Sequence, residues 1–172
     1  MRVGITGHQE LKDPRDWDWV KVKIDDLLTT LPKPIVGLTC LAVGADSLFA
    51  RIVLQHSGLI EAVIPLPGYE LTFQARDRDD YRWLIGRASK VTNLPRESTD
   101  EESYFEAGKR VVDLADLVIA VWDGKPAKGL GGTADIVEYA RQRRKAMIHF
   151  DPVQHLVDGS PQLDCLDTSK KH

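Results

Sequence analysis

Apolar residues occur along this chain in two patterns: short unbroken runs, and longer stretches in which they recur every three or four positions. The unbroken runs predict buried strands, because strands covered on both faces are apolar throughout. The longer stretches predict amphipathic helices. The predicted strands cover residues 2–5, 35–43, 59–66, 90–94, 116–121 and 146–150. The predicted helices cover residues 17–31, 48–55, 73–89 and 102–114, and a last helix follows residue 133 and ends near residue 144.

Strands that alternate with helices favour a single parallel sheet with helices on both faces. We therefore predict an α/β fold, doubly wound, with a mostly parallel sheet of Rossmann-like type. Residues 1–150 form one such domain, without an internal repeat or an interdomain linker. Residues 151–172 contain prolines, glycine and many polar residues, and this composition predicts an irregular C-terminal tail.

The composition is that of an ordinary globular protein, with 172 residues, 42% hydrophobic and 28% charged, and a formal net charge of −3. Nucleic-acid binding usually shows as a basic excess or patch, so nucleic acid is predicted to be an unlikely partner. No apolar stretch approaches the roughly 20 residues that span a bilayer, and the N-terminus does not resemble a signal peptide. We expect a cytoplasmic protein with no membrane contact. Cys40 and Cys165 show no metal-ligand spacing, and the residues identify neither a metal nor a cofactor.

Three glycine-containing turns each follow a predicted strand: Thr6-Gly7-His8, Gly44-Ala45-Asp46 and Gly131-Gly132-Thr133. In a parallel sheet all three turns lie at the same edge, where ligands bind near a topological switch point. Glycine lets a ligand approach the backbone, and the N–H groups that begin a helix favour an anion. We therefore predict a binding pocket at this edge. Its expected lining residues are Thr6, Gly7, His8, Gly44, Ala45, Asp46, Asp123, Gly131, Gly132 and Thr133.

These features also have structural interpretations. A glycine turn can serve close packing alone, and Asp46 can cap the following helix instead of accepting from ribose hydroxyls. His8 can bind a phosphate or ribose or hold its own loop. Tyr69 and Trp122 can stack on a base or pack at the rim. The glycine spacing fits neither the Walker phosphate loop nor the dinucleotide fingerprint, which argues against an ATPase or a dehydrogenase.

The chain resembles the SLOG superfamily in three short motifs: Ile5-Thr6-Gly7-His8, the Leu-Ala-Val-Gly-Ala-Asp stretch at 41–46, and Gly131-Gly132-Thr133. The resemblance covers roughly residues 1–150. This Rossmann-like group includes the DNA-processing DprA proteins, the cytokinin-activating LOG phosphoribohydrolases and molybdenum-cofactor carrier proteins. It implies a doubly wound fold, frequent homodimers, and a pocket for a nucleotide or a nucleotide-derived molecule.

One departure from the family concerns catalysis. LOG enzymes carry a Pro-Gly-Gly-x-Gly-Thr-x-x-Glu pattern whose glutamate takes part in N-glycosidic cleavage. Aligned on Gly132-Thr133, that glutamate falls on Ile136. The nucleophilic glutamate of the related deoxyribosyltransferases, aligned on Tyr139-Ala140, also falls on Ile136.

The resemblance and this departure together favour a homo-oligomeric binding protein or sensor for a nucleotide-derived small molecule. One alternative is a nucleotide N-glycosidase or phosphoribosyl hydrolase that uses Asp135, Glu138 or Asp123. Another is a protein similar to the molybdenum-cofactor carriers.

Overall fold

A computed structural model describes residues 1–126 and 130–159 of the chain. At its centre is a seven-stranded sheet with the strand order β4-β3-β2-β1-β5-β6-β7. Strands β1 to β6 are parallel, and β7 runs antiparallel to β6. The strands are β1 (Arg2–Gly7), β2 (Val36–Thr39), β3 (Leu59–Ile64), β4 (Lys90–Asn93), β5 (Leu117–Val121), β6 (Ala146–Asp151) and β7 (Leu156–Asp158).

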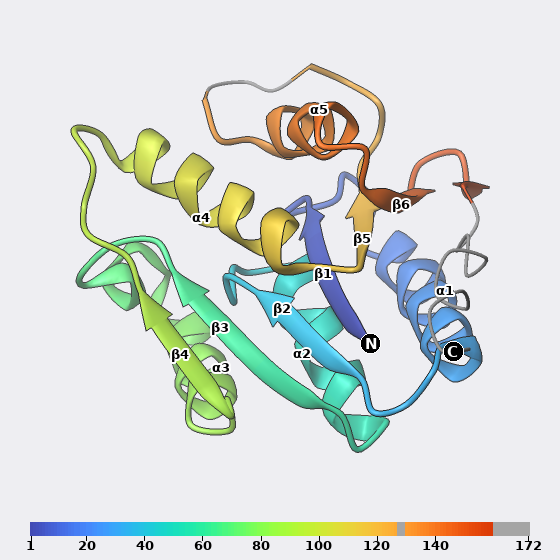
Figure 1. The fold of residues 1–172 in the computed structure, drawn as a ribbon, viewed down its shortest axis with the longest axis horizontal. Coiled ribbons are helices and arrows are strands. Elements are labelled where there is room, and N and C mark those ends of the chain that lie inside the picture. The colour runs from blue at the N-terminus through green and yellow to red at the C-terminus, as the bar shows by residue number, and fades with distance from the viewer. Residues whose placement is uncertain (127–129, 160–172) are drawn as a thin grey trace, which may run out of the picture.

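Helices cover both faces of this sheet. Helices α1, α2 and α3 pack in one apolar cluster with the sheet, and α4 and α5 pack in a second cluster on the opposite face (Figure 1). The helices are α1 (Asp16–Thr30), α2 (Ala45–Gln55), α3 (Ala75–Ile85), α4 (Asp100–Leu114) and α5 (Thr133–Gln142), with a short 3₁₀ helix, η1 (Tyr69–Thr72), before α3. The predicted fold class, a doubly wound and mostly parallel α/β sheet, is confirmed.

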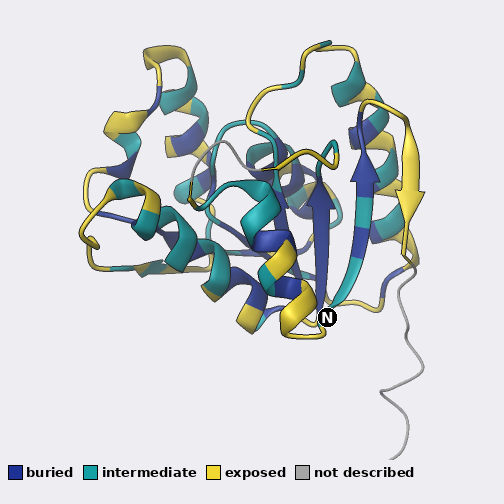
Figure 2. Cartoon of the chain, turned by 90° about the horizontal axis from the view of Figure 1, so that it is seen from above, coloured by how far each residue is buried: buried dark blue, intermediate teal, exposed yellow. Residues whose placement is uncertain are grey.

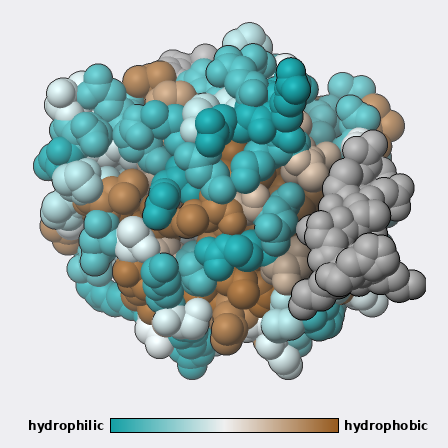
Figure 3. All heavy atoms as spheres, viewed as in Figure 1, coloured by the Kyte–Doolittle hydropathy of each residue, from teal (hydrophilic) through white to brown (hydrophobic). Residues whose placement is uncertain are grey.

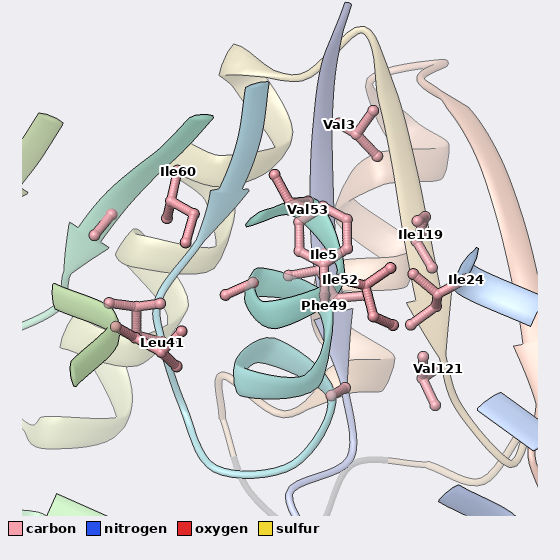
Figure 4. Packing of buried hydrophobic residues seen from close by; sticks show 14 of the residues in the cluster. Val3, Ile5, Ile24, Leu41, Phe49, Ile52, Val53, Ile60, Ile119 and Val121 are labelled. Carbon is pink, nitrogen blue, oxygen red and sulfur yellow. The ribbon is translucent and has the colours of Figure 1, made fainter. Parts of the chain in front are cut away.

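The alternation of side chains along the central strands explains their unbroken apolar sequences. Ile119 of β5 points to the α1–α3 side, where it joins Ile24 and Phe49 (Figure 4). Its neighbour Val118 joins the opposite cluster, together with Val111 of α4. Because both faces are covered, every residue of β5 is buried and none can be polar at low cost (Figure 2).

The junction between β2 and α2 differs from the sequence-based expectation. The helix begins at Ala45, three residues earlier than predicted, and its N-cap is Gly44 with φ of 85°. Asp46 therefore does not cap the helix. Its Oδ2 atom instead accepts hydrogen bonds from the Thr39 hydroxyl at 2.7 Å and from the Cys40 N–H at 2.8 Å. The side chain thus ties the start of α2 to the end of β2.

Two other segments also differ from the prediction. The helix expected over 73–89 is shorter and is preceded by η1, because Phe73 has an extended backbone between the two. In the predicted irregular tail, β7 pairs with β6 and forms one edge of the sheet. All three residues of β7 are exposed, so no alternation of polar and apolar positions marks it in the sequence (Figure 2). The rest of the predicted tail, residues 160–172, lies outside the described residues.

In the part of the chain that the structure describes, no helix is long and apolar enough to cross a bilayer. On the face seen in Figure 3, hydrophobic side chains gather in the middle among hydrophilic ones. The large exposed apolar residues, such as Leu59, Leu71 and Val153, belong to different elements. Apolar side chains of this kind are common on globular proteins.

Phe49 is the largest fully buried side chain, and its replacement tests the core described above. We expect Phe49→Ala to lower the free energy of unfolding by about 3–5 kcal/mol, because it removes apolar contacts and leaves a cavity. Urea denaturation followed by circular dichroism measures this loss. The control Leu71→Ala, at a side chain that is 65% exposed, should change stability by less than about 0.5 kcal/mol. Similar losses in both variants would contradict this assignment of the core.

The buried carboxylate of Asp46 predicts a pH dependence of stability. Burial raises the pKa of Asp46 from 3.8 to about 6. The hydrogen bonds from Thr39 and Cys40 lower the pKa, but by less than burial raises it. Folding therefore favours the protonated form, so the contribution of this group is greatest below pH 3.8 and is lost as the pH rises through about 6. The loss amounts to about 3 kcal/mol.

The variant Asp46→Asn keeps an acceptor oxygen for Thr39 and Cys40 but has no charge to bury. Urea titrations at about pH 4 and about pH 7 should show it gaining stability relative to the parent by up to about 3 kcal/mol at the higher pH. A stability difference that is the same at both pH values would show that the Asp46 carboxylate is not desolvated in the folded protein.

Candidate functional site

The order in which strands are added to the sheet reverses between β1 and β5. These two strands are neighbours, and Gly7 lies opposite Val121. After β1 the chain continues through α1 to β2 on one side, and after β5 it continues through α5 to β6 on the other. Such a divergence leaves a crevice beyond the carboxyl ends of the strands. A cavity of about 1320 Å³ lies there. Its lining includes residues at the ends of the strands, the middle of α4 and the start of α5.

Most of the residues predicted to form a pocket line this cavity. They are Thr6, Gly7, His8, Asp46, Asp123, Gly131, Gly132 and Thr133. In the described structure Gly44 and Ala45 do not line it. Residues 127–129 of the long glycine turn lie outside the described residues.

Packing between the first two turns explains their glycines. A Cβ atom on Gly7 would lie 2.6 Å from the Cβ of Ala45 and 2.8 Å from the Cβ of Val121. A Cβ on Gly44 would lie 2.5 Å from the carbonyl oxygen of His8, and Gly44 also has a positive φ. The N–H of Ala45 donates to that same oxygen at 3.1 Å. Gly44 and Ala45 therefore pack against the loop after β1 and fix its position without lining the cavity themselves.

The third turn lines the cavity and contains backbone N–H groups without a partner in the described structure. Gly131 has φ of 83°, and its own N–H is satisfied by Asp135 Oδ2 at 2.9 Å. The N–H groups of Gly132, Thr133 and Ala134 find no acceptor among the described residues. These three groups begin α5 and belong to residues that line the cavity. Together with the helix dipole they form a site suited to an anion.

His8, Asp123 and Lys125 all line the cavity and lie close to one another. The Nε2 atom of His8 lies 3.1 Å from both the backbone nitrogen and Oδ1 of Asp123. Burial raises the pKa of Asp123, but hydrogen bonds from Lys125 and the charges of His8 and Lys125 outweigh it, and the net pKa is below the ordinary value. The Lys125 Nζ atom is 2.6 Å from Asp123 Oδ2. The carboxylate is therefore ionised and already paired.

Ile136, which aligns with the catalytic glutamate of the LOG enzymes, is an apolar residue in the wall of the cavity. Ile136 lines the cavity, is only 3% exposed, and packs against Gly108 of α4, where a Cβ would lie 2.4 Å from Ile136 Cδ1. Asp135 is occupied by the N–H of Gly131. Glu138 is exposed and accepts from Gln142 at 3.2 Å.

The cavity also has lining residues that were not predicted from the sequence. Among them are residues 9–14 of the loop after β1, Pro65, Thr72 and Phe73 after β3, and Tyr104, Ala107 and Gly108 of α4. The helix itself was predicted, but its place beside the cavity was not, because α4 crosses the sheet between β4 and β5 and that placement depends on the strand order. One local signal does mark its start: Thr99 and Glu102 form a capping box, which places Tyr104 near the first turn.

Neither family models nor curated proteins match the sequence. Solved structures do match the fold. DprA from Helicobacter pylori superposes with a TM-score of 0.61 at 16% identity, covering 87% of this chain and 64% of that one. DprA from Streptococcus pneumoniae gives a TM-score of 0.61 at 17% identity, with 96% and 53% covered. A structural-genomics target designated TM1055 gives 0.55 at 14% identity, with 85% and 71% covered.

These matches correct one expectation about partners. The H. pylori DprA structure is described by its single-stranded DNA binding mode. The sequence-based expectation that nucleic acid is an unlikely partner is therefore wrong, because net charge averaged over a whole chain does not report what one edge of a sheet can bind.

The chain spans between about half and two-thirds of the length of the DprA chains it matches, 53% and 64%. These structures share the Rossmann-like arrangement of this chain at low sequence identity. The chain therefore has a Rossmann-like fold similar to that of the DprA structures.

Proposed function

We propose that this protein binds a nucleotide or a nucleotide-derived molecule in the cavity, with its phosphate at the start of α5. The observation that carries this proposal is the set of three N–H groups, of Gly132, Thr133 and Ala134, that have no acceptor in the described structure and begin a helix at the cavity wall. An anion at this position gains hydrogen bonds and a favourable interaction with the helix dipole.

The charges around the cavity support this placement of the phosphate. Among the described lining residues the lysines are Lys12 and Lys125, and none is an arginine. Lys125 is paired with Asp123. The α5 N-terminus is therefore the part of the wall best suited to a phosphate.

We propose a binding protein or sensor, acting as a homo-oligomer in the cytoplasm, and not a hydrolase. Ile136 cannot supply the carboxylate of the LOG mechanism, and Asp135 and Asp123 each have a partner within the protein. No observation on the described residues favours a molybdenum-cofactor carrier. The nucleotide unit can be a free small molecule or the end of a single strand, and the experiment below separates the two sources.

Thr133→Glu tests the anion site, because it places a negative charge at the start of α5. An acidic residue there suits the helix dipole and leaves the fold intact, but it repels a bound phosphate. Isothermal titration is carried out with AMP, ADP, cyclic AMP, ADP-ribose and a short single-stranded oligonucleotide. We expect at least one of these to bind the parent protein, and Thr133→Glu to weaken that binding by about tenfold or more.

The matched control is Gln142→Glu, which makes the same charge change at the exposed far end of the same helix. It should leave the affinity unchanged within about twofold. Binding of the oligonucleotide alone identifies a strand end as the source of the nucleotide unit. If no probe binds the parent, or if both variants bind as the parent does, the proposal fails.

A further inference from the structure

The cavity wall opposite α5 is built from aromatic rings held in fixed positions. Tyr69 and Phe73 are 5% and 8% exposed, and their ring centroids lie 4.7 Å apart. Tyr104 of α4 lies 6.1 Å from Tyr69. The backbone beneath them is fastened by Arg78, whose Nε donates to the Phe73 carbonyl at 3.1 Å. A wall of immobilised rings suits the flat face of a base.

One buried carboxylate lines the same cavity. Asp46 is 6% exposed, and its Oδ2 atom accepts from the Thr39 hydroxyl and the Cys40 N–H. Hydrogen bonds from the backbone of Ala42 and Leu41 also lower the pKa of this carboxylate. Asp46 and Tyr69 both line this cavity. Burial raises the pKa of Tyr69, and the charges of Cys40 and Asp46 add to that rise. An ionised carboxylate only accepts hydrogen bonds. A ligand group that faces it must therefore be a donor.

The distance along the sheet fits a single nucleotide. From the end of β5, which leads to α5, to the end of β2, which leads to Asp46, there are two strand steps. Neighbouring strands lie about 4.8 Å apart, so the two ends of the cavity are separated by roughly 10 Å. A nucleoside monophosphate can bridge this gap with its phosphate at α5 and its base against Tyr69, Phe73 and Tyr104.

We propose that this end of the cavity is a base-binding subsite in which Asp46 accepts a hydrogen bond from an exocyclic amino group. The site then selects amino-bearing bases over their keto counterparts, in which an acceptor oxygen would face the carboxylate. This inference rests on the proposed function, since it assumes that the phosphate is bound at α5.

Two pairs of ligands isolate the amino group: AMP against IMP, and CMP against UMP. We expect the parent protein to bind the amino member of a pair about tenfold or more tightly. In Asp46→Asn, whose amide can both donate and accept, the ratio should fall toward one. Ribose 5-phosphate, which has no base, should bind the parent and Asp46→Asn equally. Tyr104→Ala provides a second variant at the rim, and it should weaken the nucleotides but not ribose 5-phosphate.

The outcomes separate the two proposals. If Thr133→Glu loses binding of both ribose 5-phosphate and the nucleotides while Gln142→Glu keeps it, the phosphate site is supported. Equal affinities within each pair in the parent protein would overturn the base subsite while leaving the phosphate site standing. A ratio of amino to keto affinity that is the same in Asp46→Asn as in the parent would overturn the base subsite as well. A difference between AMP and deoxy-AMP that disappears in Asp46→Asn would place Asp46 at the sugar and would also overturn it. If ribose 5-phosphate, the nucleotides and the oligonucleotide all fail to bind the parent protein, the proposed function fails and the base subsite with it.

Discussion

At the point where β1 and β5 diverge, three stretches of backbone meet with no room for another side-chain atom between them. Gly7 touches Ala45 and Val121, and Gly44 presses against the carbonyl of His8. These contacts bring the ends of β1 and β5 and the start of α2 into one fixed arrangement. The cavity, the exposed N–H groups of α5 and the position of Asp46 all depend on it, because each lies on a segment that leaves this junction.

Most of the architecture could be predicted from the sequence because the physical causes are local. Unbroken apolar runs such as 117–121 identify strands buried on both faces, and the glycine turns after them identify one edge of a parallel sheet. The order of the strands is a different matter, since it depends on contacts between distant residues. For that reason the crossing of α4, and with it Tyr104, could not be placed, and the exposed strand β7 carried no pattern to detect.

The same limit applies to the site. A sequence shows that glycine is needed at a turn but not whether a ligand or a neighbouring backbone takes up the space. Here Gly7 and Gly44 are explained by packing, whereas the amides that follow Gly131 face the cavity with no partner in the described chain. The role of Asp46 also required the structure, because a helix that starts at Ala45 turns an expected cap into a buried tie to Thr39.

The close packing of Gly131 has a consequence for the shape of the cavity. A Cβ on this residue would lie 2.7 Å from the carbonyl of Glu101 and 3.0 Å from the nitrogen of Phe105, so the loop before α5 rests directly on the backbone that carries Tyr104. Any side chain at position 131 would therefore push the loop before α5 and the backbone of α4 apart, so this glycine sets the spacing between these two walls of the cavity.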